Sequence, residues 1–334
     1  MAALEDSIDR VAATTGFSGV VRVDRHGRTE LARAYGLAHR GCRVPNTVDT
    51  RFGIASGTKG LTALTVASLV EEGRLELATT ARSVLGEDLP LIHDDVTVEQ
   101  LLAHRSGIGD YLDEDAVASM TDYVLPVPVH RLATTTDYLA VLDGHPQAFP
   151  PGDRFAYNNG GFVVLALIAE RVSGTPFAEL VRMRVCEPAG MGDTAFLRSD
   201  ETAERTALGY LDSDGLRTNL LHLPVRGSGD GGICTTAADI SALWSALFAG
   251  RIVPVDRVAE LLRPRSDVAS ESMRYGLGFW LHPTSDAVQL EGCDAGVSFR
   301  SVHDPATRVT STVLSNTTDG AWPVSRCLRE LLTR

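Results

Sequence analysis

A serine and a lysine stand three residues apart, Ser56 and Lys59, at the start of the apolar stretch GLTALTVASL. Residues at i and i+3 lie on the same side of a helical turn, so the lysine amine can reach the serine hydroxyl and take its proton. The apolar residues from Leu61 to Leu69 cover nearly every face of a helix, which predicts that this helix is buried. Poor solvation and the helix dipole lower the pKa of a lysine at such an N-terminus, so its neutral amine can act as a general base.

This pair is a weak signal by itself, because two fixed residues recur by chance in many chains. Ser56 could instead cap the helix, and Lys59 could extend its side chain along the surface to water. In the catalytic interpretation the helix start also favours negative charge on Ser56, and its backbone N–H can bind an oxyanion.

A second group of polar residues is Tyr157-Asn158-Asn159, between the loop FPPGDRF and the apolar helix GGFVVLALIAERVSG, which we expect to end near Gly174. A phenol beside an ammonium ion has a lowered pKa and can relay a proton. The alternatives are that Tyr157 is a core aromatic residue with a bonded hydroxyl and that Asn159 is a helix cap.

These motifs occur in a recognisable order along the chain. The Ser-x-x-Lys motif lies about one hundred residues before the Tyr-x-Asn motif, and TVEQLLAHRSGI, EPAGMGDTAF, GDGGICTTAADI and YGLGFW accompany them. Together they cover roughly residues 16 to 320. The chain thereby resembles the serine β-lactamase and penicillin-binding-protein superfamily, in particular its class C and esterase branch.

The resemblance implies an α/β fold of the α+β type, with an antiparallel sheet flanked by helices and a mostly helical lobe. It implies a serine hydrolase that forms an acyl-enzyme with a small ester or amide and needs no cofactor. Ser56 would be the acylated nucleophile and Lys59 its proton acceptor. Tyr157 would pass the proton to the leaving group, and Asn159 would orient Lys59 and the substrate.

The third motif of that superfamily, Lys-Thr-Gly or His-x-Gly on a strand, is altered here. We expect its counterpart at Glu291-Gly292-Cys293, where a carboxylate replaces the cation and a cysteine replaces the glycine that lets substrate approach. Asp294 would then supply the second oxyanion N–H. Glu291 would repel a substrate carboxylate, so neutral or amine-bearing esters and amides are expected. Alternatively, Glu291 is a solvated strand residue, and Cys293 is expected to be a buried thiol.

Other chemistries have little support in the sequence. There is no Gly-x-Ser-x-Gly elbow, and the stretch from Gly229 to Gly232 is too short for a dinucleotide fingerprint. The nine histidines show no His-Glu-x-x-His spacing, and the five cysteines form no Cys-x-x-Cys pair, so we expect no metal and free thiols. We expect His104 to make a structural hydrogen bond.

Strand patterns lie at both ends of the chain and helical patterns lie between them. An N-terminal helix, a β-hairpin around His26-Gly27, three strand-like runs in the last third and a terminal helix through Leu332 predict one antiparallel sheet built from both termini. A short helix is expected over 97–104 with Thr97 as its cap, and a helical lobe or lid over 109–144. We expect a single domain, with a sheet lobe (about 1–75 and 241–334), a helical lobe (about 76–240) and the site in the cleft between them.

Composition limits the class of partner. The chain has 334 residues, is 44% hydrophobic and 22% charged, and carries a net charge of −12, which argues against nucleic acid or an anionic membrane as a partner. No apolar run of membrane-spanning length and no secretory signal pattern occurs, so a cytoplasmic location is expected. The expected partner is a small-molecule ester or amide, and the oligomeric state is not indicated. The alternative function is biosynthetic acyl transfer, or binding without catalysis, by the same fold.

Overall fold

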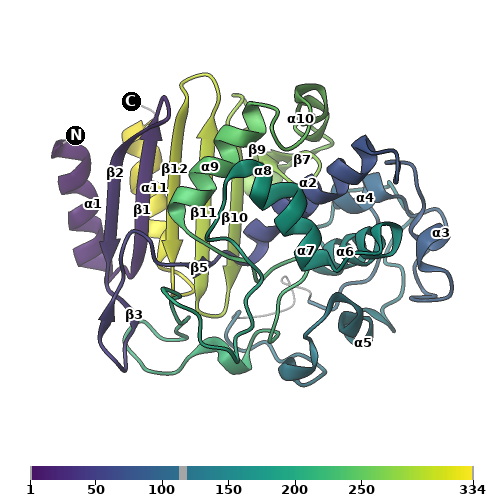
Figure 1. The fold of residues 1–334 in the computed structure, drawn as a ribbon, viewed down its shortest axis with the longest axis horizontal. Helices are drawn as coiled ribbons and strands as arrows, with labels where there is room; N and C mark the ends of the chain where they lie inside the picture. The colour runs from purple at the N-terminus through teal and green to yellow at the C-terminus, as the bar shows by residue number, and fades with distance from the viewer. Residues whose placement is uncertain (1, 113–118, 333–334) are drawn as a thin grey trace.

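The computed structural model describes residues 2–112 and 119–332, and an eight-stranded antiparallel sheet is its largest element (Figure 1). The strand order is β2-β1-β12-β11-β10-β9-β8-β7. β1 pairs with β12 from Gly19↔Ser315 to Arg25↔Val309, so the two ends of the chain join inside one sheet, as predicted. The strands are β1 (Gly19–Arg25), β2 (Arg28–Tyr35), β7 (Ser266–Val268), β8 (Met273–Tyr275), β9 (Trp280–Leu281), β10 (Val288–Asp294), β11 (Val297–Asp304) and β12 (Val309–Ser315).

Tight turns set the register of the two main hairpins. His26 and Gly27, at φ 52° and 74°, join β1 to β2, the left-handed pair that two-residue hairpins require. Ala295-Gly296 joins β10 to β11, with Gly296 at φ 72°. One of the three strand-like runs of the last third, AVQLEGCDAGVSFRSVHD, is therefore two paired strands.

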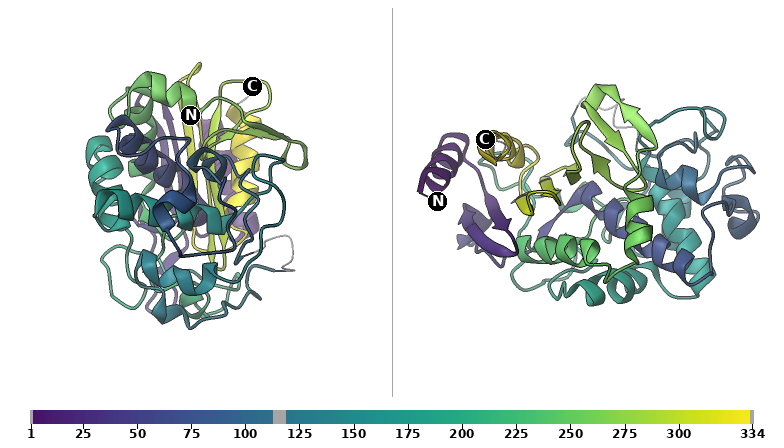
Figure 2. Two further views of the ribbon diagram at one scale, coloured as in Figure 1. Left: turned by 90° about the vertical axis from the view of Figure 1, so that its right-hand side faces the viewer. Right: turned by 90° about the horizontal axis from the view of Figure 1, so that it is seen from above.

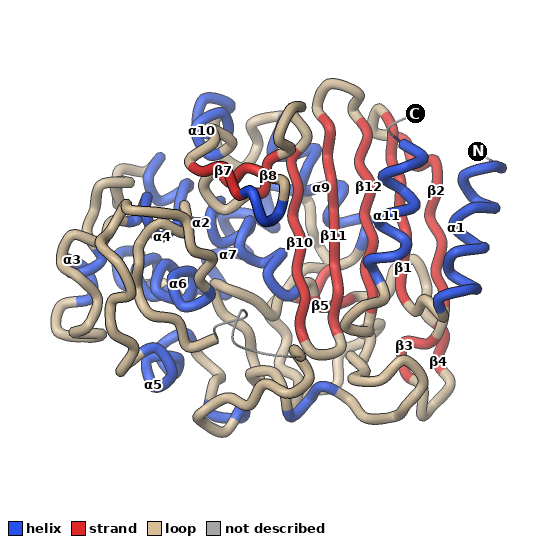
Figure 3. The backbone as a smooth tube through the Cα atoms, turned by 180° about the vertical axis from the view of Figure 1, so that it is seen from behind, coloured by secondary structure: helices blue, strands red, loops and turns tan. Residues whose placement is uncertain are grey.

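Helices cover both faces of the sheet (Figures 2 and 3). The terminal helices α1 (Ala2–Thr15) and α11 (Ala321–Leu332) lie on one face, where Val324 and Leu328 of α11 join a core with Val21 and Val313. On the opposite face α9 (Ala237–Phe248) packs against β1 and β12. The face under α9 is partly polar, since Ser241 of α9 donates its hydroxyl to Asp24 of β1 at 2.7 Å and Thr312 of β12 is buried.

Two buried helices form the centre of the helical side of the molecule. They are α2 (Thr58–Glu71), buried from Thr58 to Leu69, and α6 (Asn159–Ser173), buried from Asn159 to Ala169. Figure 1 shows them beside the sheet, at the β10 end. The prediction of a helix apolar on every face is confirmed for α2, and both helices begin near the site.

The remaining elements are short. The segment 109–144 was expected to be a helical lobe or lid, but it contains three short helices joined by irregular chain, and its part 113–118 lies outside the described residues. Thr97 caps α4 through a capping box with Gln100. These elements are β3 (Leu37–His39), β4 (Val44–Pro45), β5 (Phe52–Gly53), η1 (Ala55–Gly57), α3 (Ala81–Leu85), α4 (Val98–Leu102), η3 (Val129–Arg131), η4 (Thr135–Tyr138), α5 (Leu139–Leu142), α7 (Phe177–Val181), the π-helix η5 (Arg182–Cys186), α8 (Glu187–Ala189), η6 (Asn219–Leu221), β6 (Cys234–Thr235), α10 (Val255–Leu261) and η7 (Ala269–Glu271).

Within the described residues, no single helix combines the length and the apolar composition needed to cross a membrane. The helix pair Asn159–Ser173 and Phe177–Ala189, bent by 84°, meets those two criteria only when taken together.

Candidate active site

Ser56 lies in the 3₁₀ turn η1, directly before α2, and not in the first turn of the α-helix as expected. Its neighbour Ala55 has φ 45°, a conformation that costs a non-glycine residue free energy and is concentrated at functional sites. Thr58 supports the turn by donating its hydroxyl to the Ala55 carbonyl at 2.7 Å. The cap of α2 is Gly57, without a side-chain hydrogen bond. Ser56 is therefore not the helix cap.

Lys59 is buried, with only 2% of its surface exposed, so its side chain does not extend to water. Its Nζ atom donates to three acceptors, which are Ser56 Oγ at 2.8 Å, Asn159 Oδ1 at 2.8 Å and the Asp230 carbonyl oxygen at 2.9 Å. Three acceptors match the three hydrogens of an ammonium ion. A neutral amine fits the same positions by donating to the two carbonyl oxygens and accepting the hydrogen of Ser56.

Tyr157 lies beside this amine, with its ring centroid 4.9 Å from Lys59 Nζ. The ring packs between His104, at 4.3 Å between centroids, and Trp280, at 6.3 Å in a stacked geometry. His104 Nδ1 accepts the backbone N–H of Asn158 at 3.1 Å, which is the structural role expected for it. Burial, and secondarily the charge of Lys59, lowers the pKa of His104 well below its ordinary value, so its ring stays neutral.

Asn159 occupies the first position of α6, and its side chain points at Lys59 and does not cap the helix. The cap is Asn158, whose Oδ1 accepts from Gly161 N at 2.6 Å. Asn159 Nδ2 donates to the Leu112 carbonyl at 3.1 Å, which turns Oδ1 toward Lys59. The structure thus brings together Ser56, Lys59, Tyr157 and Asn159, the four residues expected from the first two motifs.

Asp110 is a site residue that the sequence analysis missed. Its carboxylate accepts the backbone N–H groups of Asn159 at 2.6 Å and Gly160 at 2.8 Å, and it thereby holds the first turn of α6. Burial, the largest effect, raises the pKa of Asp110 to about 6 against these hydrogen bonds. Asp110 and Asn159 are 49 positions apart, so no local pattern links them.

Asp230 was also missed, although the glycine-rich stretch that contains it was noted. Its carbonyl accepts from Lys59, and its Oδ2 accepts the Tyr111 hydroxyl at 2.5 Å. Burial raises the pKa of the Asp230 carboxyl, and the nearby charge of Lys59 partly opposes this. The stretch therefore contributes to the lysine site.

The expected third motif lies on β10, and its glycine, Gly292, lies against the nucleophile turn. A Cβ on Gly292 would lie 2.2 Å from the Ile54 carbonyl oxygen and 2.6 Å from Ser56 N, so Gly292 is the residue that allows β10 to lie against the nucleophile turn. Cys293 and Asp294, the next two residues, both line the pocket beside Ser56. The register of the motif toward the substrate stays a prediction.

Glu291 is not brought to Ser56. Successive strand side chains point to opposite faces, so Glu291 faces away from the turn that Gly292 contacts. Its carboxylate accepts from Arg300 Nη2 at 2.6 Å and from Gln289 Nε2 at 3.0 Å. The expected repulsion of substrate by Glu291 therefore has no support in this geometry. Cys293 is half-buried, and its Sγ donates to the Thr318 carbonyl at 3.5 Å.

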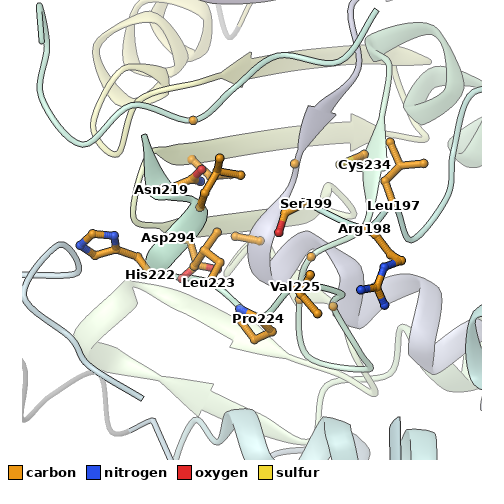
Figure 4. Close-up of a pocket in the computed structure, with 18 of the residues that line it drawn as sticks. Leu197, Arg198, Ser199, Asn219, His222, Leu223, Pro224, Val225, Cys234 and Asp294 are labelled. Carbon is orange, nitrogen blue, oxygen red and sulfur yellow. The ribbon is translucent and has the colours of Figure 1, made fainter. Parts of the chain in front are cut away.

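A pocket of about 430 Å³ opens beside Ser56, and Figure 4 shows part of its lining. Cys293 and Asp294 at the end of β10 line it, together with segments 197–203 and 219–225. Much of the lining is apolar, including Leu112, Leu125, Leu197, Leu208, Leu220, Leu223, Val225 and Val297.

Acidic side chains outnumber basic ones in this lining. The acidic residues are Asp200, Glu201, Asp230 and Asp294, and the arginine is Arg198, which pairs with Asp200 at 2.7 Å and Glu201 at 3.5 Å. The pocket thus presents an apolar surface with an excess of negative charge. Among the described residues, no group of three or more His, Cys, Asp or Glu side chains is arranged to hold a metal ion.

Comparison with known proteins places this geometry in a family. A solved penicillin-binding protein from Bacillus halodurans superposes with a TM-score of 0.91 at 34% identity, over 97% of this chain and 99% of that one. Esterase EstB of Burkholderia gladioli is 34% identical over 208 residues, 58% of this chain and 50% of its own. The putative penicillin-binding protein PbpX of Bacillus subtilis is 26% identical over 274 residues, 81% of this chain and 63% of its own.

The chain spans less than two thirds of the length of these two curated relatives. The family model for Beta-lactamase matches residues 4–332, nearly the whole sequence. The serine, lysine and tyrosine of the site lie within that match, on the fold that the solved relative shares. The chain therefore belongs to the β-lactamase family.

Proposed function

We propose that this protein is a serine hydrolase that forms an acyl-enzyme at Ser56 with a small ester or amide. The observation that carries the proposal is the contact of 2.8 Å between Lys59 Nζ and Ser56 Oγ, with the amine held on its other sides by two carbonyl oxygens. This contact places Ser56 Oγ where its proton can pass directly to the amine. The resemblance to an esterase supports the same reaction class.

In acylation, Ser56 Oγ attacks the substrate carbonyl carbon while its proton moves to the neutral amine of Lys59. The resulting ammonium donates to Ser56, Asn159 and Asp230 without any rearrangement, because all three acceptors are already in place. The tetrahedral intermediate then releases the alcohol or amine, which takes a proton relayed through Tyr157. Water hydrolyses the acyl-enzyme by the reverse proton transfers.

The negative oxygen of the intermediate requires N–H donors at the nucleophile turn. We assign these to the backbone N–H groups of Ser56 and Cys293, because Gly292 is the residue that contacts the turn and Cys293 follows it. In this assignment the third motif is Leu290-Glu291-Gly292. The second oxyanion donor is then the backbone N–H of Cys293, whereas the sequence alone suggested that of Asp294. This arrangement lies in the proposed cleft between a sheet lobe (about 1–75 and 241–334) and a helical lobe (about 76–240).

The pocket supports an apolar substrate that lacks a carboxylate. Leucine and valine side chains line it, and its acidic residues exceed its single arginine, which is already paired. We propose neutral or amine-bearing esters and amides as substrates, with Asp294 and Asp230 as the source of the selectivity in place of Glu291.

Covalent labelling tests the proposal. A fluorophosphonate should add its mass to the wild-type protein at Ser56, and Ser56→Ala should remain unmodified. The same two proteins are then assayed with a neutral ester, alone and with an added alcohol or amine as acceptor. Labelling with release of free acid supports the hydrolase. A wild-type protein that stays unlabelled would instead indicate a binding protein, and product formed only with the acceptor would indicate acyl transfer.

A further inference from the structure

The glycine-rich loop 227–232 is held tightly between the two central helices. Thr62 of α2 donates its hydroxyl to the Gly229 carbonyl at 2.6 Å. On the other side, a Cβ on Gly229 would lie 2.0 Å from the carbonyl oxygen of Phe162 in α6. Only glycine fits at this contact. The next residue of the loop, Asp230, is therefore held in a defined place between α2 and α6.

Asp230 reaches the lysine site with both its backbone and its side chain. The carbonyl accepts from Lys59 Nζ at 2.9 Å, and the buried carboxylate accepts from the Tyr111 hydroxyl at 2.5 Å. Tyr111 is itself held, since its backbone carbonyl accepts the hydroxyl of Tyr123. We infer that Asp230 is a positioning residue for Lys59, whose carbonyl aims the amine at Ser56 and whose carboxylate supplies the charge that stabilises the ammonium ion formed in acylation.

The need for such a charge follows from burial. An ammonium ion in a water-poor site is unfavourable unless an anion lies nearby. Among the described residues, the groups near Lys59 include Ser56 from η1, Tyr157 and Asn159 around the start of α6, His104, Asp110 and Asp230.

Among these described groups, Asp110 and Asp230 are the carboxyl groups that interact with the charge of Lys59. Asp110 already accepts the N–H groups at the start of α6. The Asp230 carboxylate accepts the Tyr111 hydroxyl and interacts with the charge of Lys59. Burial, with a further contribution from Asp230, raises the pKa of Tyr123 and Tyr138. The negative charge of the Asp230 carboxylate can therefore stabilise the protonated form of Lys59.

A charge near a base has two opposite effects on the rate. It raises the proton affinity of the amine, so the resting enzyme keeps less of the neutral form at low pH. The nearby negative charge also makes the neutral amine a stronger base toward the proton of Ser56. Removing the charge should therefore extend activity to lower pH and at the same time reduce the maximal rate. A residue that only supports the loop would reduce the rate without moving the pH dependence.

Lys59 is the only lysine in the sequence, which makes a direct measurement possible. Protein labelled with ¹³C at the lysine Cε gives a single side-chain resonance, and its chemical shift is followed against pH in the wild type and in three variants. Asp230→Asn keeps the acceptor for Tyr111 and removes the charge. Tyr111→Phe removes the hydrogen bond that lowers the pKa of Asp230 and so reduces the charge indirectly. Glu291→Gln removes a carboxylate on the far face of β10 as the control.

We expect the titration midpoint of Lys59 to fall by about one pH unit in Asp230→Asn, by less in Tyr111→Phe and not at all in Glu291→Gln. The acid limb of kcat/KM for p-nitrophenyl acetate should move with it, and the maximal rate of Asp230→Asn should fall about threefold. Unchanged midpoints in Asp230→Asn and Tyr111→Phe would overturn the inference. If Asp230→Asn does not fold, Tyr111→Phe alone decides, since an unchanged midpoint there is equally contrary.

This inference rests on the proposed role of Lys59 as the base. Separate measurements show whether the proposed function or only the role of Asp230 is wrong. If the proposed function is wrong, fluorophosphonate leaves wild-type Ser56 unlabelled. If only the role of Asp230 is wrong, Ser56 is labelled and the resonance of Lys59 titrates alike in wild type and Asp230→Asn.

Discussion

At the scale of single residues, the site depends on how Lys59 is held. A buried amine with three acceptors can lose or gain one proton without moving, because each protonation state has a complete set of hydrogen bonds. The same arrangement makes the residue difficult to replace. A substitute without an N–H donor leaves the Asn159 side-chain oxygen and the Asp230 carbonyl without the hydrogen bonds that Lys59 supplies.

Two substitutions of Lys59 distinguish its role as a proton acceptor from the effect of its positive charge. Lys59→Met removes both, and Lys59→Arg keeps a positive charge that cannot be lost at accessible pH. We expect both variants to lose at least about 100-fold in kcat/KM, since general base catalysis contributes about that much or more. Ester hydrolysis at neutral pH measures this, and thermal unfolding confirms folding. Wild-type turnover in either variant would show that Lys59 is not the base.

Ser56→Ala should behave differently from the lysine variants. Its hydroxyl accepts from Lys59 but caps no helix, so we expect hydrolysis to be abolished while the free energy of unfolding changes by less than about 1 kcal/mol. Urea unfolding and ester hydrolysis on the same preparation measure both. Residual hydrolysis close to the wild-type rate would place the nucleophile elsewhere.

At the scale of elements, the close approach of β10 to η1 positions the nucleophile. Gly292→Ala would place a methyl group against the Ile54 carbonyl and the Ser56 amide, both of them backbone atoms that cannot turn aside. The strand must then move, and the proposed oxyanion donors on the two elements separate. We expect a loss of about 100-fold in kcat, the size seen when one such donor is removed.

Gly192→Ala is the matched control for this change, because its Cβ would meet no atom within 4 Å. It should retain the wild-type kcat. If Gly292→Ala also retains it, the proposed register of the third motif is wrong.

The start of α6 is a second element that the site depends on. Asp110→Ala leaves the N–H groups of Asn159 and Gly160 without their acceptor. We expect a loss of about 2–4 kcal/mol in the free energy of unfolding, from two buried donors at about 1–2 kcal/mol each. Urea unfolding measures it, with Asp153→Ala in an exposed loop as a control that should change little.

The difference in stability between wild type and Asp110→Ala should also depend on pH. The folded pKa of about 6 exceeds the ordinary value of 3.8, so between these values the folded protein binds more protons than the unfolded chain. Stability from this carboxyl is complete at low pH and decreases as pH rises from about 4 to about 6. An increase over that range would contradict the burial of the carboxyl.

At the scale of the whole molecule, charge is distributed in favour of neutral and cationic substrates. The net charge of −12 and the acidic excess in the pocket act in the same direction. We expect kcat/KM for a carboxylate-bearing ester to be at least about tenfold below that of its methylated analogue, equivalent to about 1.4 kcal/mol. Both esters are measured on the wild type, on Asp294→Asn and on Glu291→Lys.

The two variants distinguish the proposed source of this selectivity from the one expected from the sequence. Asp294→Asn should raise the rate ratio of the anionic to the neutral ester, because Asp294 lines the pocket. Glu291→Lys should leave the ratio unchanged, because Glu291 faces away from the turn and pairs with Arg300. A ratio that rises in Glu291→Lys and stays unchanged in Asp294→Asn would show that Glu291 is the source of the selectivity against anionic esters.

Several features of this protein follow from the sequence alone because they are local. Three residues separate Ser56 from Lys59, and a helical turn brings such residues together wherever it forms. The apolar residues of α2 predict its burial, and strand patterns at both termini predict a shared sheet. These inferences use only the period of a helix or strand, which is the same in every fold.

The tertiary structure decided what depends on distant contacts. Asp110 meets α6 from 49 positions away, and Asp230 meets Lys59 from 171 positions away. The register of β10 follows from whether Gly292 or Cys293 can lie against the Ser56 amide, a matter of backbone contact between two elements. The sequence could supply the nucleophile and its base, but the acceptors that hold the base and the strand that completes the site come from packing.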